Sequence, residues 1–141
     1  MTQEELDARE QIRDLVARYN ANGDSGRFDE VLALFCSDAT MIIEDKVYSG
    51  IAEISTIFTD TRDRVAAAET PQIMRHHTAT HQIDVLSNDE ATGRAYFQVI
   101  MAAGLDHWGR YLDSYRREGD RWMFDSRRVL TDGYSPDSLF L

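Results

Sequence analysis

Three residues with side chains suited to proton transfer stand out in this chain: Tyr19, Asp24 and His76. A carboxylate that contacts an imidazole inside an apolar pocket fixes the tautomer of the ring and stabilises the cation formed when the ring accepts a proton. Tyr19 and Asp24 lie at the end of one amphipathic segment, and His76 opens a strand-like segment roughly fifty residues later. General acid–base catalysis is therefore available to this chain if the fold brings Asp24 and His76 into contact.

The spacing of Tyr19 and Asp24 leaves a structural alternative open. Five residues along a continuous helix amount to about 500°, which places the two side chains about 140° apart. Gly23 is expected to end the helix, so that Asp24 can turn back over the last turn toward the same opening. Asp24 can equally be a plain turn or capping residue, and Tyr19 a core aromatic with its hydroxyl at the rim.

The histidines allow one pocket residue and no metal site. His76 and His77 are adjacent, so on a strand they point to opposite faces and only one of them can enter a pocket. His81 shares the parity of His77. At about 3.3 Å per residue these two are about 13 Å apart, which is too far for a shared zinc ion.

Composition predicts a single domain over residues 1–141 and disfavours several classes of partner. The 25 acidic and 15 basic residues give a net charge of −10, which disfavours binding to nucleic acid. No apolar run reaches the roughly 20 residues of a membrane helix. The N-terminal residues MTQEELDARE are unlike a signal peptide, and the single Cys36 cannot form an internal disulfide. We therefore expect a cytoplasmic protein that does not act at a membrane.

The hydrophobic pattern predicts an α+β domain. Three helices come first, and the rest of the chain alternates as strands separated by turn residues. We expect helices from a capping box at Thr2 to Gly23, around residues 28–35 and over 51–67. We expect strands at 39–44, 47–48, 74–86, 91–103, 108–117 and 121–131, with turns at 87–89, 104–106 and 119–120. The sheet should curl around the helices and leave an open mouth at one end.

The last predicted strand carries Arg127 and Arg128, whose orientation depends on the turn that joins this strand to the one before it. If Gly119 and Asp120 form a two-residue turn, Arg128 shares the aromatic face with Tyr111 and Arg127 lies on the opposite face. A longer turn or a bulge reverses this assignment.

Taken together, these segments resemble the SnoaL-like branch of the NTF2-like superfamily over nearly the whole chain. Each motif is weak alone, but their order and spacing are typical of the family. The motifs are Arg18-Tyr19-Asn20-Ala21-Asn22-Gly23-Asp24, Leu34-Phe35 with Asp38-Ala39, Gly50, Arg75-His76, Gly109-Arg110-Tyr111, Tyr115-Arg116-Arg117, and Trp122 with Arg127.

The resemblance implies a cone-shaped barrel with three N-terminal helices packed on a curved, mostly antiparallel sheet around a deep apolar cavity. It also implies a homodimer or higher homo-oligomer formed through the sheet. The chain is most similar to the scytalone dehydratase, bile-acid dehydratase and hexachlorocyclohexane dehydrochlorinase group, whose members eliminate water or HCl with an Asp–His pair and no cofactor. Tyr19, Asp24 and His76 match the motif positions of that group. Arg127 matches a cavity arginine of the dehydrochlorinase-like members, and we give this match priority over the simple strand register.

Two departures shape the expected function. Scytalone dehydratase has a second catalytic histidine on the following strand, whereas residues 97–101 here contain none. Dehydrochlorinase has a lysine near the position of Tyr19, whereas the bile-acid enzymes have a tyrosine. The resemblance thus favours a dehydratase-like lyase acting on a small apolar or polycyclic substrate. His76 would be the base, Asp24 its orienting partner, Tyr19 a hydrogen-bond donor and Arg127 a stabiliser of negative charge. Phe58, Phe97, Val99 and Met101 are the expected cavity wall.

Two alternatives remain open at this point. The same base could serve a ketone isomerase or polyketide-cyclase-like enzyme, which needs no leaving group. The domain could also bind a small molecule without catalysis, because fold does not determine function. A hydrogen-bonded Asp24–His76 pair beside an open pocket favours catalysis, whereas separated side chains or a filled cavity favour binding alone.

Overall fold

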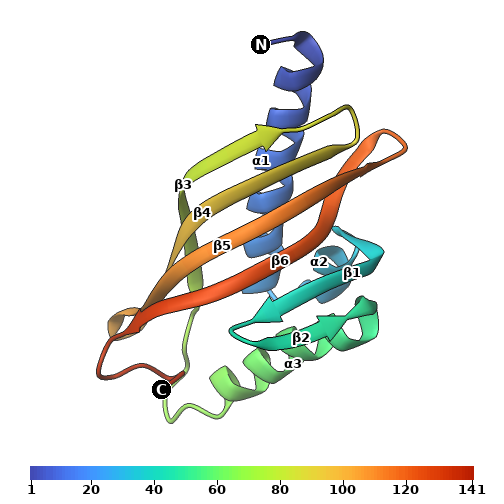
Figure 1. Cartoon of the computed structure of the whole chain (residues 1–141). Helices are drawn as coiled ribbons and strands as arrows, with labels where there is room; N and C mark the ends of the chain where they lie inside the picture. The colour runs from blue at the N-terminus through green and yellow to red at the C-terminus, as the bar shows by residue number, and fades with distance from the viewer.

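The computed structural model describes all 141 residues and consists of three helices and a six-stranded sheet (Figure 1). The elements are α1 (Gln3–Asp24), α2 (Phe28–Leu32), β1 (Phe35–Ile43), β2 (Lys46–Ser49), α3 (Gly50–Ala66), β3 (Arg75–Val85), β4 (Glu90–Met101), β5 (Gly104–Glu118) and β6 (Arg121–Tyr134). The strands lie in the order β2-β1-β6-β5-β4-β3, and every pair is antiparallel except β1 with β6. The predicted α+β fold with helices on a curved, mostly antiparallel sheet is confirmed.

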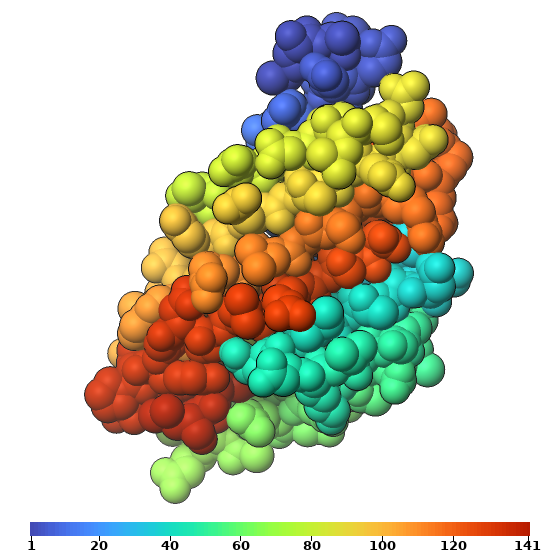
Figure 2. Space-filling view, viewed as in Figure 1, coloured from blue at the N-terminus to red at the C-terminus, as the bar shows by residue number.

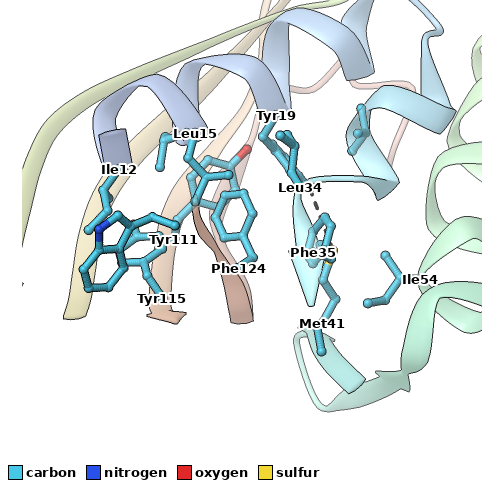
Figure 3. Packing of buried hydrophobic residues seen from close by; sticks show 14 of the residues in the cluster. Ile12, Leu15, Tyr19, Leu34, Phe35, Met41, Ile54, Tyr111, Tyr115 and Phe124 are labelled. Carbon is cyan, nitrogen blue, oxygen red and sulfur yellow. Dashed lines mark hydrogen bonds between the residues drawn. The ribbon is translucent and has the colours of Figure 1, made fainter. Parts of the chain in front are cut away.

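The helices cover one face of the sheet, and α1 forms the centre of the core (Figures 1 and 3). Its first turn has the predicted capping box, in which Thr2 and Glu5 exchange side-chain to backbone hydrogen bonds of 3.0 and 3.1 Å. One face of α1 then packs its apolar residues against aromatic rings of β5 and β6. The residues drawn together in Figure 3 include Ile12, Leu15, Tyr19, Tyr111, Tyr115 and Phe124.

The predicted stop of α1 at Gly23 is wrong by one residue. The helix continues through Gly23, ends at Asp24 and is followed by Ser25 as its C-cap. The left-handed backbone conformation that ends such a helix lies at Gly26, whose φ is 75°. Gly23 therefore occupies a helical position that any L-residue can adopt.

Replacing Gly23 with alanine should stabilise the protein by up to about 1 kcal/mol, because alanine loses less backbone entropy in a helix. A Cβ at this position would lie 3.9 Å from Phe58 and Val31, which is an ordinary contact distance. Thermal unfolding measures the effect as a higher midpoint temperature. The matched control is Gly109→Ala, where a Cβ would collide with the backbone oxygen of Leu130 and should destabilise the fold. A lower midpoint for Gly23→Ala would contradict the helical assignment.

The turn predicted at residues 104–106 is also misplaced. The connection between β4 and β5 lies at residues 102–103, and β5 already begins at Gly104. Gly104 has a φ of 109°, a backbone conformation that glycine adopts without steric cost. The glycine is therefore used at the first residue of β5, directly after the turn. The shift places Asp106 and His107 inside a strand.

Bulges in three strands change which side chains face the helices. In β3 the register shifts between Ala79 and Gln82, around Thr80 with a φ of 53°. In β5 it shifts at Asp106, and in β6 it shifts at Asp125 and again at Asp132. Each bulge adds a residue to one strand and so reverses the alternation beyond it. The simple parity prediction for His81 and the simple register prediction for Arg127 fail for this reason.

One end of the molecule brings together segments that are far apart in sequence. The C-terminal residues lie beside the loop that follows α3, whereas the first turns of α1 project at the opposite end (Figure 2). The ends of α1, α3 and the long strands meet in the same region. No helix of the structure is both long and apolar enough to cross a membrane.

Candidate active site

A cavity of about 990 Å³ opens at this end of the molecule. Of its 31 lining residues 16 are hydrophobic, so the wall is about half apolar and half polar. It is bordered by the C-terminal part of α1, the end of α3, the loop after α3, the inner face of the sheet and the C-terminal segment. Its aromatic lining consists of Tyr19, Phe28, Phe58, Phe97, Tyr111, Tyr134 and Phe140.

Asp24 and His76 contact each other in the wall of this cavity. The distance between His76 Nδ1 and Asp24 Oδ1 is 2.7 Å, and the backbone N–H of His76 donates to Asp24 Oδ2 at 2.8 Å. The side chains of His76 and Asp24 are 19% and 9% exposed. An ionised Asp24 holds the proton of a neutral ring on Nδ1, which leaves the Nε2 lone pair free. Nε2 has no hydrogen-bond partner in the protein and is not fully buried, and His76 lines the cavity.

Tyr19 lines the cavity beside this pair, although it does not hydrogen-bond to it. Its hydroxyl lies 4.0 Å from the sulfur of Met41, which is a weak acceptor (Figure 3). Burial raises the pKa of Tyr19, while the nearby Arg127 opposes the rise. The hydroxyl therefore keeps its proton at neutral pH.

Arg127 faces the interior, contrary to the simple two-residue-turn register, but it does not occupy the cavity position that the family resemblance implied. The bulge at Asp125 turns it inward, and Arg128 is exposed. Arg127 does not border the cavity. Its guanidinium is completely buried, with Nε and Nη2 donating to Asp113 at 2.8 and 2.9 Å, and it lies 4.3 Å from the ring centre of Tyr19. Its remaining nitrogen, Nη1, has no hydrogen-bond partner.

The expected apolar wall residues fall into two groups. Phe58 and Phe97 line the cavity. Val99 and Met101 are buried in the core and do not border it. The alternation of β4 turns Phe97, Val99 and Met101 inward, but of these three only Phe97 borders the cavity.

His107 is a cavity residue that the sequence analysis missed. It lines the wall, and its Nδ1 lies 2.7 Å from Asp106 Oδ1. Gly104 and Asp106 are both common in turns, and this led to the misplaced turn. The available signal was an Asp-His pair between Leu105 and Trp108, because apolar residues on both sides favour a strand over a turn. No group of three or more His, Cys, Asp or Glu side chains is arranged to hold a metal ion.

His81 illustrates the effect of the bulge at Thr80. The bulge reverses the predicted parity, so His81 points inward, with Nε2 3.1 Å from the Tyr115 hydroxyl, while His77 is exposed. Burial lowers the pKa of His81, and that of His107, below the usual 6.5. The folded state therefore disfavours both imidazolium ions.

Stability should consequently fall as the pH is lowered. Above pH 6.5, the ordinary pKa of histidine in the unfolded chain, His81 and His107 are neutral in the folded and in the unfolded protein. In that range their protonation does not change the free energy of unfolding. Below it the unfolded chain binds protons that the folded protein resists, and stability is lost. Thermal midpoints measured between pH 8 and pH 5 should decrease, and they should decrease less in His81→Gln, which lacks one titrating group. An unchanged slope in that variant would contradict the assignment.

Comparisons with known proteins agree with this architecture. The sequence model of the SnoaL-like domain family matches residues 4–128. A putative scytalone dehydratase from Novosphingobium aromaticivorans superposes with a TM-score of 0.82 at 20% identity, covering 96% of this chain and 91% of that one. A hexachlorocyclohexane dehydrochlorinase, LinA-type3, from Novosphingobium barchaimii has a TM-score of 0.80 at 17% identity, with 94% and 92% covered.

A protein of unknown function from Mycobacterium tuberculosis, solved as a point variant, is 25% identical with a TM-score of 0.79, covering 95% of this chain and 77% of that one. The sequence matches none of the curated proteins with which it was compared. At these identities the solved structures establish a shared fold and do not establish a shared reaction. The match over residues 4–128 spans most of the chain, and it places this chain in the SnoaL-like domain family.

Proposed function

We propose that the protein is a cofactor-independent lyase that eliminates water from a small apolar or polycyclic substrate. The observation that carries this proposal is the 2.7 Å contact between Asp24 and His76 in the wall of an open cavity whose lining is about half apolar. A hydrogen-bonded pair beside an open pocket favours catalysis over binding alone. The dehydratase and dehydrochlorinase with the same fold make elimination the first reaction to test.

His76 is the general base in the proposed reaction. Its Nε2 removes a proton from a carbon made acidic by a neighbouring carbonyl, and the C–H electrons form the new double bond as the C–O bond to the leaving hydroxyl breaks. The imidazolium then returns the proton to the leaving oxygen, which departs as water. Asp24 stabilises the imidazolium, whose charge the apolar surroundings disfavour.

Tyr19 and Arg127 support the charge that develops on the substrate. The Tyr19 hydroxyl donates to the carbonyl oxygen, whose negative charge increases as the C–H proton leaves. Arg127 lies behind the ring of Tyr19 and does not border the cavity. We therefore assign it a positioning role, in which its buried charge holds the aromatic rings of Tyr19 and Tyr111.

Isomerisation of a ketone is the second candidate, because the same base and the same donor serve it. In that reaction His76 returns the proton to another carbon and nothing leaves. The mass of the product distinguishes the two reactions, since elimination lowers it by one water and isomerisation leaves it unchanged.

The direct test is proton exchange in D₂O. The purified protein is incubated with a panel of bicyclic and polycyclic β-hydroxy ketones and β,γ-unsaturated ketones, and products are followed by mass spectrometry and NMR. We expect faster loss of water, or deuterium incorporation next to the carbonyl, than in buffer for at least one compound. Equal rates in wild type and His76→Ala for every accelerated compound would reject His76 as the base.

We also propose self-association through the outer face of the sheet. Tyr96, Trp108 and Leu112 are exposed there on the adjacent strands β4 and β5, with exposed fractions of 58%, 37% and 38%. Sedimentation velocity should give a mass above that of the 16.1 kDa chain, and Trp108→Glu should lower it. A monomer at micromolar concentration would contradict this part of the proposal.

A further inference from the structure

A second imidazole, that of His107 on β5, lines the cavity and has no part in the proposed reaction. His107 lies directly after the bulge at Asp106, and this bulge breaks the strand alternation so that both adjacent side chains are buried. Bulges commonly redirect a side chain next to a functional site. The side chain of His107 is 11% exposed and that of Asp106 only 3%, so the carboxylate lies behind the ring. The arrangement resembles that of His76 with Asp24, in which a carboxylate also holds Nδ1 at 2.7 Å.

Asp106 is held in turn by the C-terminal segment. Its carboxylate accepts hydrogen bonds from the Ser138 hydroxyl and from the backbone N–H of Leu139, the latter at 3.0 Å. Its backbone oxygen accepts from the N–H of Ser135 at 2.8 Å. The ring of Phe140 lies 4.9 Å from that of His107. The last residues of the chain thus support the orientation of this imidazole.

The two imidazoles flank the same stretch of wall. His76 and His107 both pair with Val99 of β4, so they stand in one row across three strands. Two strand spacings put their backbones about 10 Å apart. The ring of Phe97 neighbours both, with its centre 6.4 Å from that of His76 and 6.1 Å from that of His107. All three residues line the cavity, so a fused-ring molecule bound beside Phe97 can reach both histidines.

The hydrogen bonds determine what His107 offers such a molecule. The Asp106 carboxylate accepts three hydrogen bonds, from the ring of His107, the hydroxyl of Ser138 and the backbone N–H of Leu139, which is the pattern of an ionised carboxylate. Burial raises the pKa of Asp106, but these hydrogen bonds outweigh it and lower the pKa below its ordinary value. The ring proton therefore sits on Nδ1. Nε2 has no hydrogen-bond partner in the protein and is not fully buried, and His107 lines the cavity. Burial lowers the pKa of His107, so the ring is neutral at pH 7. His107 consequently presents a bare lone pair in a wall of aromatic rings.

We propose that Nε2 of His107 accepts a hydrogen bond from a hydroxyl group of the substrate, at a position remote from the carbon on which His76 acts. The substrate class is then a fused-ring molecule with a carbonyl-activated C–H near one end and a hydroxyl donor toward the other. This inference rests on the proposed function for the role of His76. His107 selects and orients the substrate, because a ligand without a hydrogen-bond donor would leave the Nε2 lone pair buried without a hydrogen bond. Such a ligand would therefore bind with lower affinity.

The test uses binding and does not require turnover. The probes are 2-naphthol, which has a hydroxyl donor, and 2-methoxynaphthalene, which has the same ring system and no donor. The nitrogen resonances of the histidine rings are recorded in ¹⁵N-labelled wild type and in His76→Ala. We expect the Nε2 resonance of His107 to shift on addition of 2-naphthol in both proteins, and to shift much less with 2-methoxynaphthalene. No shift at His107 in His76→Ala, where it is the remaining cavity imidazole, would overturn the proposal.

Affinity measurements provide the second arm. His107→Phe should weaken 2-naphthol binding about 3- to 10-fold relative to 2-methoxynaphthalene, which corresponds to one neutral hydrogen bond. His107→Gln should keep most of the preference, because its amide oxygen can accept in place of Nε2. An unchanged preference in His107→Phe would overturn the proposal. If His76→Ala lost turnover while His107 did not respond to 2-naphthol, the proposed function would stand and the hydroxyl site would be rejected. If His76→Ala kept full turnover while His107 did respond to 2-naphthol, the hydroxyl site would stand and the proposed function would be rejected.

Discussion

Replacing His76 with alanine should lower turnover of a true substrate about 10²- to 10⁴-fold, the usual contribution of a positioned general base. The cavity and fold should be unchanged, because the side chain lies at the wall and not in the core. The loss should appear in kcat more than in KM, since proton removal occurs in the transition state. Steady-state kinetics with a compound identified by proton exchange, together with thermal unfolding of the variant, measures both expectations.

The adjacent histidine supplies the matched control. His77 follows His76 on β3 and is exposed on the opposite face, so His77→Ala should keep wild-type turnover. Asp24→Asn tests the partner of the base. It removes the charge that stabilises the imidazolium and replaces one carboxylate acceptor with an NH₂ donor, so it should also reduce kcat strongly. Full activity of His76→Ala would refute the mechanism, whatever the result for Asp24→Asn.

Replacing Asp113 with leucine should destabilise the protein by about 3–5 kcal/mol, because it leaves the guanidinium of Arg127 buried without a counter-ion. Both side chains of this pair are 0% exposed, and two hydrogen bonds join them. Burial disfavours the charged form of Arg127, and Asp113 compensates by raising its pKa, so removing Asp113 leaves the burial penalty uncompensated. The guanidinium cannot escape this penalty by losing its proton, because arginine keeps its proton in proteins. Chemical denaturation compares the unfolding free energies of variant and wild type.

Two further variants separate charge pairing from packing. The double variant Asp113→Leu with Arg127→Met should recover most of the lost stability, since an apolar pair of similar size often replaces a buried ion pair at little cost. Asp132→Asn removes the partner of Arg110 in an exposed pair, whose side chains are 39% and 45% exposed, and should change stability by less than about 1 kcal/mol. Equal losses of unfolding free energy for Asp113→Leu and Asp132→Asn would show that the cost of removing the acidic partner does not depend on its burial.

The sequence alone determined the class of fold and the order of its elements. Apolar residues at helical spacing from Leu6 to Tyr19 and alternating residues in the last four strands are local patterns, and local patterns reflect the period of the element they form. The capping box at Thr2 and Glu5 is likewise complete within four residues. The pairing of Asp24 with His76 came from the family resemblance, because no local pattern relates residues 52 positions apart.

The tertiary structure decided which polar side chains face inward. The bulge at Thr80 turns His81 into the core, the one at Asp106 buries Asp106 and His107 together, and the one at Asp125 turns Arg127 beneath Tyr19. A bulge forms where a curved sheet must follow the helices packed on it, so its position depends on packing between distant segments and leaves little trace in the local sequence. Because one added residue reverses every later side chain, the period-2 rule that located the strands could not by itself orient their histidines and arginines.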